Sequence, residues 1–517
     1  MQKLPIGVQS FTSLRRDDLL YVDKTAQLLK LIENGRRYFL SRPRRFGKSL
    51  TLSTLEAMFS GKAELFRGLA AEGWVKEQYK DPRSVVRIDM SSLRMYSTAE
   101  ELNNSLVKGL EDFAFLHDLD IPSERTGSGA LLKLILTLYK KFGPVVVLID
   151  EYDKPILDNI DNLEKAEEMR KVLRSFYGIL KSCDEYVRFV FITGISKFSK
   201  MGVFSAMNNL LDISLNEDYA DIVGYTQKEL EENFAEWIDL TASKMNVSRR
   251  EMLTRVKDYY DGFSFDGKTC LYNPFSILSF FATGRFSNYW YASGSSSFIV
   301  NYMRSHLISD PEIYRHFAVS AYFLDNYEIE RATPESFLYQ SGYLTIEKWE
   351  EDQITLNYPN VEVYKSITRM YLEDVYKVDS YISIGSELWK SLSSRKLPET
   401  LELYNTALAG ISYEDFSKRD EFWYRSLFLM LLRGAGITVY GEIHTHKGRA
   451  DMLVKFPKLS VIFEFKFAKT SSEVAQKMLE GKRQMEEREY AKSYNLEGCE
   501  VITAVIVVDD ENRRAVI

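Results

Sequence analysis

The sequence predicts an α/β protein, in which a parallel sheet with helices on both faces precedes a helical middle region and a second, smaller α/β unit. Short apolar runs alternate with amphipathic helical patterns from residue 38 to about residue 213, as they do in a parallel sheet. Toward the other end, a helical pattern opens at residue 421 and apolar strands follow it. We place the region boundaries at residues 1–220, 221–365 and 366–517, with the core of the last region at about 412–510.

Composition limits the classes to which the protein can belong. With 517 residues, of which 45% are hydrophobic and 27% are charged, the chain can build several cores of a globular protein. It has no apolar run long enough to span a membrane and no signal-peptide core at its start, so we expect a cytoplasmic protein without a membrane partner. The 3 cysteines are too widely spaced to form a zinc-ligand pair. A net charge of −7 argues against nonspecific coating of nucleic acid, so contact with nucleic acid would need a local basic surface.

The first motif is a loop between a predicted strand and a predicted helix. An apolar run at residues 38–40 leads into SRPRRFGKSL at residues 41–50, and apolar residues then follow at helical spacing. In such a loop, backbone N–H groups surround phosphates, while Lys48 supplies a charge and Ser49 a hydroxyl for Mg²⁺. A chance match is the alternative, because Arg42 stands where the usual pattern has a glycine. The residues expected to bind phosphate are Arg44, Arg45, Phe46, Gly47, Lys48, Ser49 and Leu50.

The second motif is a buried strand that ends in two acids. Residues 145–149 are all apolar, and Asp150 and Glu151 follow them directly. In a phosphate-loop ATPase, Asp150 would hold Mg²⁺ through water, and Glu151 would orient or deprotonate the attacking water. Acids that merely cap a strand are the alternative for this motif alone. Its occurrence after the loop, in the expected order, favours the catalytic interpretation.

Two further apolar runs complete the predicted sheet. Residues 85–88 precede Asp89, and residues 189–193 end in Thr193. In a parallel sheet, ligands bind at the carboxyl ends of the strands. We therefore expect Thr193 to lie beside the aspartate of the neighbouring strand. By analogy with the equivalent strand of AAA-type ATPases, Thr193 and Ser196 are the candidates for sensing a γ-phosphate.

Near the carboxyl end, charged side chains interrupt apolar strands. We predict three strands between residues 437 and 467, with residues 448–451 forming a turn into the second. Alternation of side chains places Glu464 and Lys466 on one face of the third strand. An Asp on one strand and Glu-x-Lys on its neighbour are typical of a Mg²⁺-dependent nuclease, in which Asp451 and Glu464 ligate the metal and Lys466 positions or activates water. A structural ion pair on an edge strand is the alternative.

Four segments carry a resemblance to a known family. They are LYVDKT at residues 20–25, SRPRRFGKSL at 41–50, LIDEYDKP at 148–155 and ITGISKFS at 192–199. Together they resemble the bacterial AAA-ATPase-like family, whose members typically carry a PD-(D/E)XK nuclease domain at the carboxyl end. In that family an arginine in place of the first glycine is the usual form of the loop. The resemblance is dense up to about residue 215, sparser in the middle, and present again near the end.

The resemblance implies further site residues. By it, residues 23–25 meet the nucleotide, with a simple capped helix start as the alternative. The residues that it adds to the nuclease domain are Glu421, as an acid of the first helix, and Gln484 and Tyr490, beside the metal. In that helix a histidine usually follows the tyrosine, whereas here Arg425 follows Tyr424. In the middle region, we expect a hairpin at residues 341–356 like the wing of a winged-helix module, which binds DNA in some proteins and is a spacer in others.

Two hypotheses follow from these motifs. In the first, the protein hydrolyses ATP and cleaves nucleic acid with Mg²⁺. In the second, it is a nucleotide-controlled switch whose nuclease fold binds without cleaving. The first requires ATP and Mg²⁺ as cofactors and a nucleic-acid partner, with DNA favoured over RNA, and it leaves oligomerisation open. Its catalytic residues would be Glu151, Lys466 and Gln484, and its metal ligands Ser49, Asp150, Glu421, Asp451 and Glu464.

Overall fold

The protein consists of two compact units in a computed structural model. The first comprises Met1–Tyr302 and Tyr314–Val363, and the second Met303–Ile313 and Tyr364–Ile517. The structure describes residues 1–78, 82–160, 162–197, 203–204, 207, 209–292, 311–325, 333–378, 381–411, 419–445, 448–489 and 499–517. Each unit is described below by itself.

A five-stranded parallel sheet organises the first unit. Its strands run in the order β2-β3-β4-β1-β5, and every neighbouring pair is parallel. The strands are β1 (Arg37–Ser41), β2 (Val85–Asp89), β3 (Val145–Asp150), β4 (Val187–Gly194) and β5 (Leu211–Asp212). All six residues of β3 are buried, which explains why its sequence is an unbroken apolar run before the terminal aspartate. The predicted parallel sheet is confirmed.

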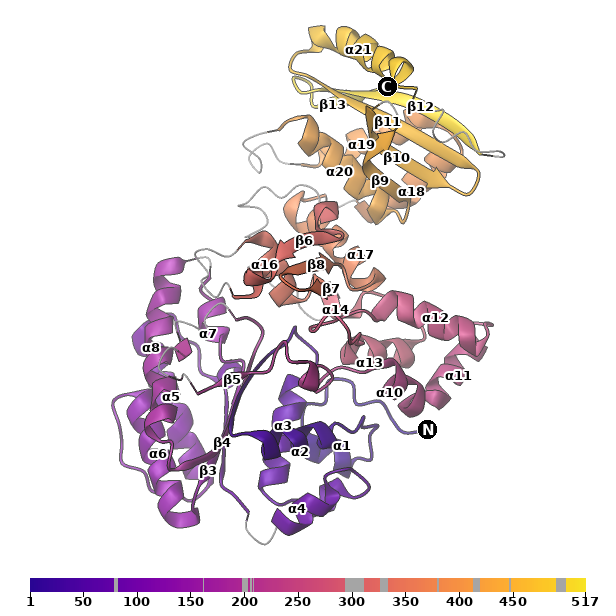
Figure 1. Ribbon diagram of the computed structural model, residues 1–517. Helices are drawn as coiled ribbons and strands as arrows, with labels where there is room; N and C mark the ends of the chain where they lie inside the picture. Colours follow the sequence, from indigo (N-terminus) through magenta and orange to yellow (C-terminus); the bar gives the residue numbers. More distant parts are fainter. Residues whose placement is uncertain are drawn as a thin grey trace. The chain divides into compact units, whose positions relative to one another are not determined.

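Helices cover both faces of this sheet (Figure 1). On one face lie α1 (Phe11–Arg16), α2 (Thr25–Asn34), α3 (Lys48–Phe59) and α4 (Glu72–Gln78). On the other lie α5 (Ala99–Leu116), α6 (Gly127–Phe142) and α8 (Leu163–Ser182), and the short α7 (Lys154–Leu157) follows β3. Local signals define these helices: in α6 the Thr126 hydroxyl caps the first turn, and Leu131, Leu134, Ile135 and Leu138 form the buried stripe.

The remainder of the first unit is a helical layer and a small sheet. The helices are α10 (Gln227–Asn233), α11 (Ala235–Lys244), α12 (Arg249–Tyr260), α13 (Pro274–Thr283), α14 (Tyr289–Ala292), α16 (Pro334–Ser341) and the start of α17 (Val361–Met370). The antiparallel sheet, in the order β6-β8-β7, contains β6 (Phe317–Ser320), β7 (Thr345–Glu350) and β8 (Gln353–Asn357). The predicted hairpin is therefore present as β7 and β8, and the strand β6 extends it.

The second unit is an α/β domain around another five-stranded sheet, in the order β13-β12-β11-β10-β9. Its strands are β9 (Thr438–Thr445), β10 (Gly448–Phe456), β11 (Leu459–Ala468), β12 (Glu500–Asp509) and β13 (Arg514–Val516), of which only β11 and β12 pair in parallel among the described residues. Its helices, besides the end of α17, are α18 (Tyr381–Ser393), α19 (Leu397–Ala409), α20 (Glu421–Gly434) and α21 (Val474–Glu487).

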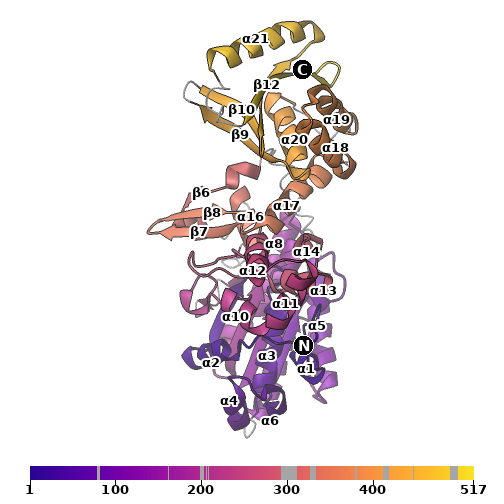
Figure 2. The ribbon, with the colours of Figure 1, turned by 90° about the vertical axis from the view of Figure 1, so that its right-hand side faces the viewer.

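The sheet of the second unit lies between its helices. Figure 2 shows α21 on one side of the sheet and the group of α18, α19 and α20 on the other. The helix α21 packs on β11 and β12 at close range: a Cβ atom added to Gly481 would lie 2.4 Å from Val505 Cγ1. Only glycine therefore allows this helix to approach the strand so closely.

One sequence expectation about this unit is wrong, and one strand was not anticipated. Residues 448–451 do not form a turn; they belong to β10, because Gly448 pairs with Thr445 and Ala450 with Ile443 in the ladder with β9. Asp451 thus lies inside a strand. The parallel strand β12 was not predicted, although its run VITAVIVV is apolar apart from one threonine. Within the described residues, no helix combines the length and apolar character needed to cross a bilayer.

Candidate functional site

The loop after β1 has a backbone geometry suited to binding an anion. Gly47 adopts a left-handed conformation with φ 97°, directly before the first residue of α3, Lys48. A Cβ atom on Gly47 would meet nothing within 4 Å, so conformation and not space calls for glycine there. Arg45 is also left-handed, with φ 67°. The loop therefore turns sharply into a helix whose first N–H groups have no partner within the helix.

Lys48 crosses the inside of this loop. Its Nζ atom donates hydrogen bonds to the carbonyl oxygens of Arg42, at 2.8 Å, and Pro43, at 2.9 Å. The side chain is buried, and this burial lowers the pKa of the Lys48 amine, while the carboxylates of Asp150 and Glu151 oppose the shift. The cation is thus held in the loop and close to both acids at the end of β3.

Asp150 and Thr193 meet at the carboxyl ends of β3 and β4. Asp150 is only 1% exposed, and its Oδ1 atom accepts hydrogen bonds from the Thr193 hydroxyl, at 2.7 Å, and from the Glu151 N–H, at 3.1 Å. Both bonds use the same oxygen, so Oδ2 is the atom that can face a ligand. Asp89, at the end of β2, is in register with Asp150, and its Oδ1 accepts a bond from the Ser91 N–H at 2.8 Å.

Glu151 has the conformation and charge environment of a functional residue. Its φ of 52° is left-handed, which is unfavourable for a glutamate. Burial raises the pKa of its carboxyl group, the positive charge of Lys48 lowers it, and Asp150 raises it. Glu151 directly follows the buried strand and lines the cavity beside the loop.

Ser196 holds the ends of β3 and β4 together instead of facing the cavity. The buried carboxylate of Asp153 accepts bonds on Oδ2 from the Ser196 N–H, at 2.7 Å, and the Ser196 hydroxyl, at 2.8 Å. Sequence reasoning offered Ser196 as a candidate and gave Asp153 no role. The second aspartate in the run DEYDKP was the available signal for this anchor.

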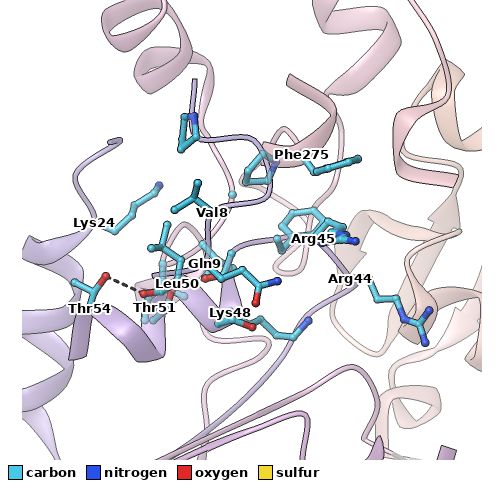
Figure 3. A pocket seen from close by; sticks show the side chains of 18 of the residues that line it. Val8, Gln9, Lys24, Arg44, Arg45, Lys48, Leu50, Thr51, Thr54 and Phe275 are labelled. Atoms are coloured by element: carbon cyan, nitrogen blue, oxygen red, sulfur yellow. Dashed lines mark hydrogen bonds between the residues drawn. The ribbon is translucent and has the colours of Figure 1, made fainter. Parts of the chain in front are cut away.

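A cavity of about 460 Å³ lies in front of the loop. Figure 3 shows Val8 and Gln9 of the amino-terminal segment and Phe275 of α13 around the loop residues Arg44, Arg45, Lys48 and Leu50. The apolar residues that line it include Val8, Val22, Leu28, Ile222, Val223, Phe275 and Leu278. The cavity therefore combines cationic side chains and the start of a helix with apolar side chains.

The segment at residues 23–25 contributes one side chain to this cavity. Lys24 lines it and forms a salt bridge of 2.6 Å with Glu229. Asp23 Oδ1 accepts bonds from the N–H and hydroxyl of Thr25, and its Oδ2 accepts one from the Ala70 N–H. Two of the three residues thus stabilise the start of α2.

Contacts from the helical layer hold the phosphate loop from outside. Arg44 O accepts hydrogen bonds from Trp290 Nε1, at 3.3 Å, and from Asn273 Nδ2, at 3.4 Å. Arg42, in the position of the usual glycine, is buried: Nη1 donates to Ser214 O at 2.6 Å, and the guanidinium lies 4.0 Å from the Phe265 ring centroid. The arginine thus anchors the loop to neighbouring segments, which the sequence alone did not indicate.

In the second unit, Asp451 and Glu464 lie on neighbouring strands. Asp451, on β10, accepts a hydrogen bond on Oδ2 from the Phe465 N–H at 2.8 Å. Its Oδ1 accepts one from Arg425 Nη1, also at 2.8 Å, in an ion pair whose side chains are 12% (Arg425) and 13% (Asp451) exposed. Arg425 comes from α20 and directly follows Tyr424 there.

Glu464 is 1% exposed and shares one oxygen with two donors. Lys466 Nζ donates to its Oε1 at 2.8 Å, and Gln484 Nε2 of α21 donates to the same atom. The other oxygen, Oε2, is buried and has no hydrogen-bond partner among the described residues. Burial raises the pKa of Glu464 to about 7, with a further increase from Asp451 and a decrease from Lys466.

Glu421 lies at the start of α20, in the electrostatic environment of these residues. Burial raises the pKa of its carboxyl group, Lys466 lowers it, and Asp451 raises it. The structure thus bonds Lys466 and Gln484 to Glu464, and it places Asp451 on the neighbouring strand, where its charge acts on both Glu464 and Glu421. Across the described parts of the chain, however, no three His, Cys, Asp or Glu side chains are arranged to hold a metal ion. Tyr490 lies outside the described residues.

Comparison with known proteins identifies the family. Residues 5–204 match the family model described as predicted AAA-ATPase, and residues 419–516 match that of the PD-(D/E)XK nuclease superfamily. A protein of Azotobacter chroococcum mcd 1, described as "Uncharacterized protein in vnfD 5'region", is 34% identical over 508 residues, which cover 96% of this chain and 94% of that protein. The chain therefore belongs to the predicted AAA-ATPase family, with a carboxyl-terminal domain of the PD-(D/E)XK nuclease superfamily.

Proposed function

We propose that the first unit binds and hydrolyses ATP and that the second cleaves nucleic acid, each with Mg²⁺. The observation that carries the proposal is the meeting of Lys48 and Glu151 at one cavity, between a phosphate-type loop and the end of a buried strand. A cation for phosphate and a carboxylate for water are the two groups that phosphoryl transfer to water requires. The parallel sheet places both on the same edge.

The donor set of the first unit fits a nucleotide with its metal ion. The N–H groups at the start of α3 and the Lys48 amine would bind the phosphates, and the apolar residues that line the cavity would accept the base. Ser49 and Asp150 would hold Mg²⁺, which when bound neutralises charge on the phosphates. Asp150 has Oδ2 available for this purpose, because its hydrogen bonds go to Oδ1.

Within this site, Lys48, Glu151 and Thr193 would each have a different role. Lys48 is already buried in the loop, so ATP binding would not have to remove its hydration shell. Its amine would exchange two neutral carbonyl partners for charged phosphate oxygens, which form stronger hydrogen bonds with a cation. Glu151 would orient or deprotonate the attacking water. Thr193 holds the Asp150 carboxylate in place through its hydroxyl.

The donor set of the second unit also fits a divalent cation. Glu464 Oε2 is a buried carboxylate oxygen to which no residue in the described part of the chain donates, and such an oxygen is costly unless a cation or proton satisfies it. Asp451 and Glu464, with Glu421 nearby, would hold Mg²⁺, which supplies Lewis-acid activation of a phosphate. Lys466 would position water, and Gln484 would fix the Glu464 carboxylate. DNA is favoured over RNA as the substrate.

One observation favours a second candidate function, a nucleotide-controlled switch that binds nucleic acid without cleaving it. Arg425 occupies Asp451 Oδ1, and the described residues hold no ready cluster of three metal ligands. If Arg425 stays bonded to Asp451 when nucleic acid is bound, the domain has the nuclease fold but does not cleave its substrate.

The two candidates are separated by paired measurements on the full chain. ATP binding and phosphate release from ATP are measured with Mg²⁺, and labelled DNA and RNA are tested in parallel for binding and for cleavage. ATP hydrolysis together with Mg²⁺-dependent cleavage supports the proposal. Hydrolysis with nucleic-acid binding but no cleavage supports the switch, and absence of ATP binding refutes both.

A further inference from the structure

Arg425 occupies a position at Asp451 where a metal would otherwise bind. Its Nη1 atom lies 2.8 Å from Asp451 Oδ1, and the Phe465 N–H takes Oδ2, so both oxygens of this carboxylate are engaged. The pair is largely shielded from solvent. Meanwhile Glu464 Oε2, on the neighbouring strand, is buried, and no described residue forms a hydrogen bond with it. One carboxylate of the site is therefore neutralised by an arginine, while the other has an oxygen ready for a cation.

The charges around the site support an exchange. Arg425 is the cation that bonds Asp451 directly, whereas Lys466 bonds Glu464. A divalent cation bound at Asp451 beside the Arg425 guanidinium would place two positive charges close together in a shielded site, which is unfavourable. Departure of Arg425 removes this repulsion and frees Asp451 Oδ1 for the metal ion.

The helix provides an alternative position for the displaced arginine. Arg425 lies one turn after Glu421 on α20, so both side chains lie on the same helix face. Its guanidinium already lies 5.3 Å from the ring centroid of Phe422, a ring that is 41% exposed. A rotation away from Asp451 would keep this cation–π contact and place the charge in water.

We propose that Arg425 and a divalent cation compete for Asp451, so that this arginine keeps the nuclease site closed to metal until it is displaced. The inference rests on the metal site of the proposed function and goes beyond it by assigning Arg425 a regulatory role. The guanidinium acts here as a positioning and blocking group and not as a catalytic one.

Titration with Mn²⁺ tests this competition without any need for cleavage. Free Mn²⁺ is followed by electron paramagnetic resonance in nucleotide-free full-length wild type, Arg425→Gln, Arg425→Lys and Asp451→Asn, and the difference from Asp451→Asn assigns the binding to this site. Arg425→Gln should bind Mn²⁺ about tenfold more tightly than wild type, because a shielded charge pair no longer has to be broken. Arg425→Lys keeps a cation and should lie closer to wild type.

Each outcome distinguishes the inference from the proposed function. Equal or weaker Mn²⁺ binding by Arg425→Gln, with binding lost in Asp451→Asn, would overturn the competition and leave the metal site standing. Mn²⁺ binding that Asp451→Asn does not change in any background would overturn both. Thermal melting verifies that each variant is folded. If Arg425→Gln is destabilised, the Mn²⁺ affinity of Arg425→Lys provides a second test of the competition.

Discussion

At the scale of single residues, the environment of Lys48 explains why we expect it to bind phosphate. It is a buried amine whose hydrogen bonds in the structure go to two loop carbonyls, which are weaker partners than phosphate oxygens. Lys48→Ala should therefore remove detectable ATP binding, measured by titration calorimetry. Lys154→Ala is the matched control: Lys154 also lines the cavity but pairs with Asp158, so this variant should bind ATP as wild type does. If Lys48→Ala titrates like wild type, the phosphates do not bind at this loop.

Glu151 should act after binding. Glu151→Gln removes a base but keeps the shape of the side chain, so it should bind ATP and lose hydrolysis by about a hundredfold or more. Single-turnover phosphate release measures this loss, and the ATP titration of the same variant is its control. Turnover equal to wild type would exclude Glu151 from the chemistry.

Residue types and spacing were enough to predict the parts of the site that come from continuous segments. Gly47, Lys48 and Ser49 do lie at a loop–helix junction, and Asp150 and Glu151 do end a buried strand. Contacts between distant segments were not predictable in the same way. The hydrogen bond from Arg42 to Ser214 O spans 172 residues, and no pattern in one sequence reveals such a partner.

At the scale of elements, the contrast between continuous segments and distant contacts also explains which strands were predicted from the sequence. The strands of the first sheet are marked by apolar runs with polar ends, and the parallel order follows from the helices between them. In the second sheet, residues 448–451 contain glycine and charged residues typical of turns, yet pairing with β9 makes them a strand. Tertiary pairing here outweighs local preference.

The first turn of α17 provides a prediction about pH. Glu362 is fully buried, accepting hydrogen bonds from the Trp290 N–H at 2.9 Å and the Ser276 hydroxyl at 2.7 Å, and burial raises the pKa of its carboxyl group from 4.5 to about 7. Below pH 4.5 the group is protonated in both folded and unfolded chains. As the pH rises toward 7, the unfolded chain loses this proton first, so the stability contribution is lost over that window.

Glu362→Gln should remove this pH dependence. The amide oxygen can accept from the Trp290 N–H and the amide nitrogen can donate to the Ser276 hydroxyl, as the protonated acid would. Relative to wild type, the variant should gain stability as the pH rises from 5 to 8, by on the order of 2–3 kcal/mol at most. Urea unfolding of both proteins at the two pH values measures the difference. A difference that stays constant would show that Glu362 does not hold its proton in the folded protein.

At the scale of the whole molecule, the two candidate sites lie in different compact units, with Lys48 in the first and Asp451 in the second. Substitutions at one chemical site should therefore leave the other chemistry intact unless the units are coupled. Glu464→Gln removes the carboxylate charge of Glu464 from the proposed metal site of the second unit. This variant should keep ATP hydrolysis within about twofold of wild type, because no residue of the nucleotide site changes. Steady-state phosphate release measures this, and a collapse of ATPase activity in this variant would show that the two units do not work independently.

The most direct test of the two-site account is cleavage of labelled DNA and RNA by the full chain in Mg²⁺, compared between wild type, Asp451→Asn and Lys466→Ala. We predict Mg²⁺-dependent cleavage by wild type, none by Asp451→Asn, and slowed cleavage by Lys466→Ala with Mn²⁺ binding retained. Cleavage that persists unchanged in Asp451→Asn, or wild type that binds nucleic acid and Mn²⁺ yet cuts neither DNA nor RNA, would contradict the account.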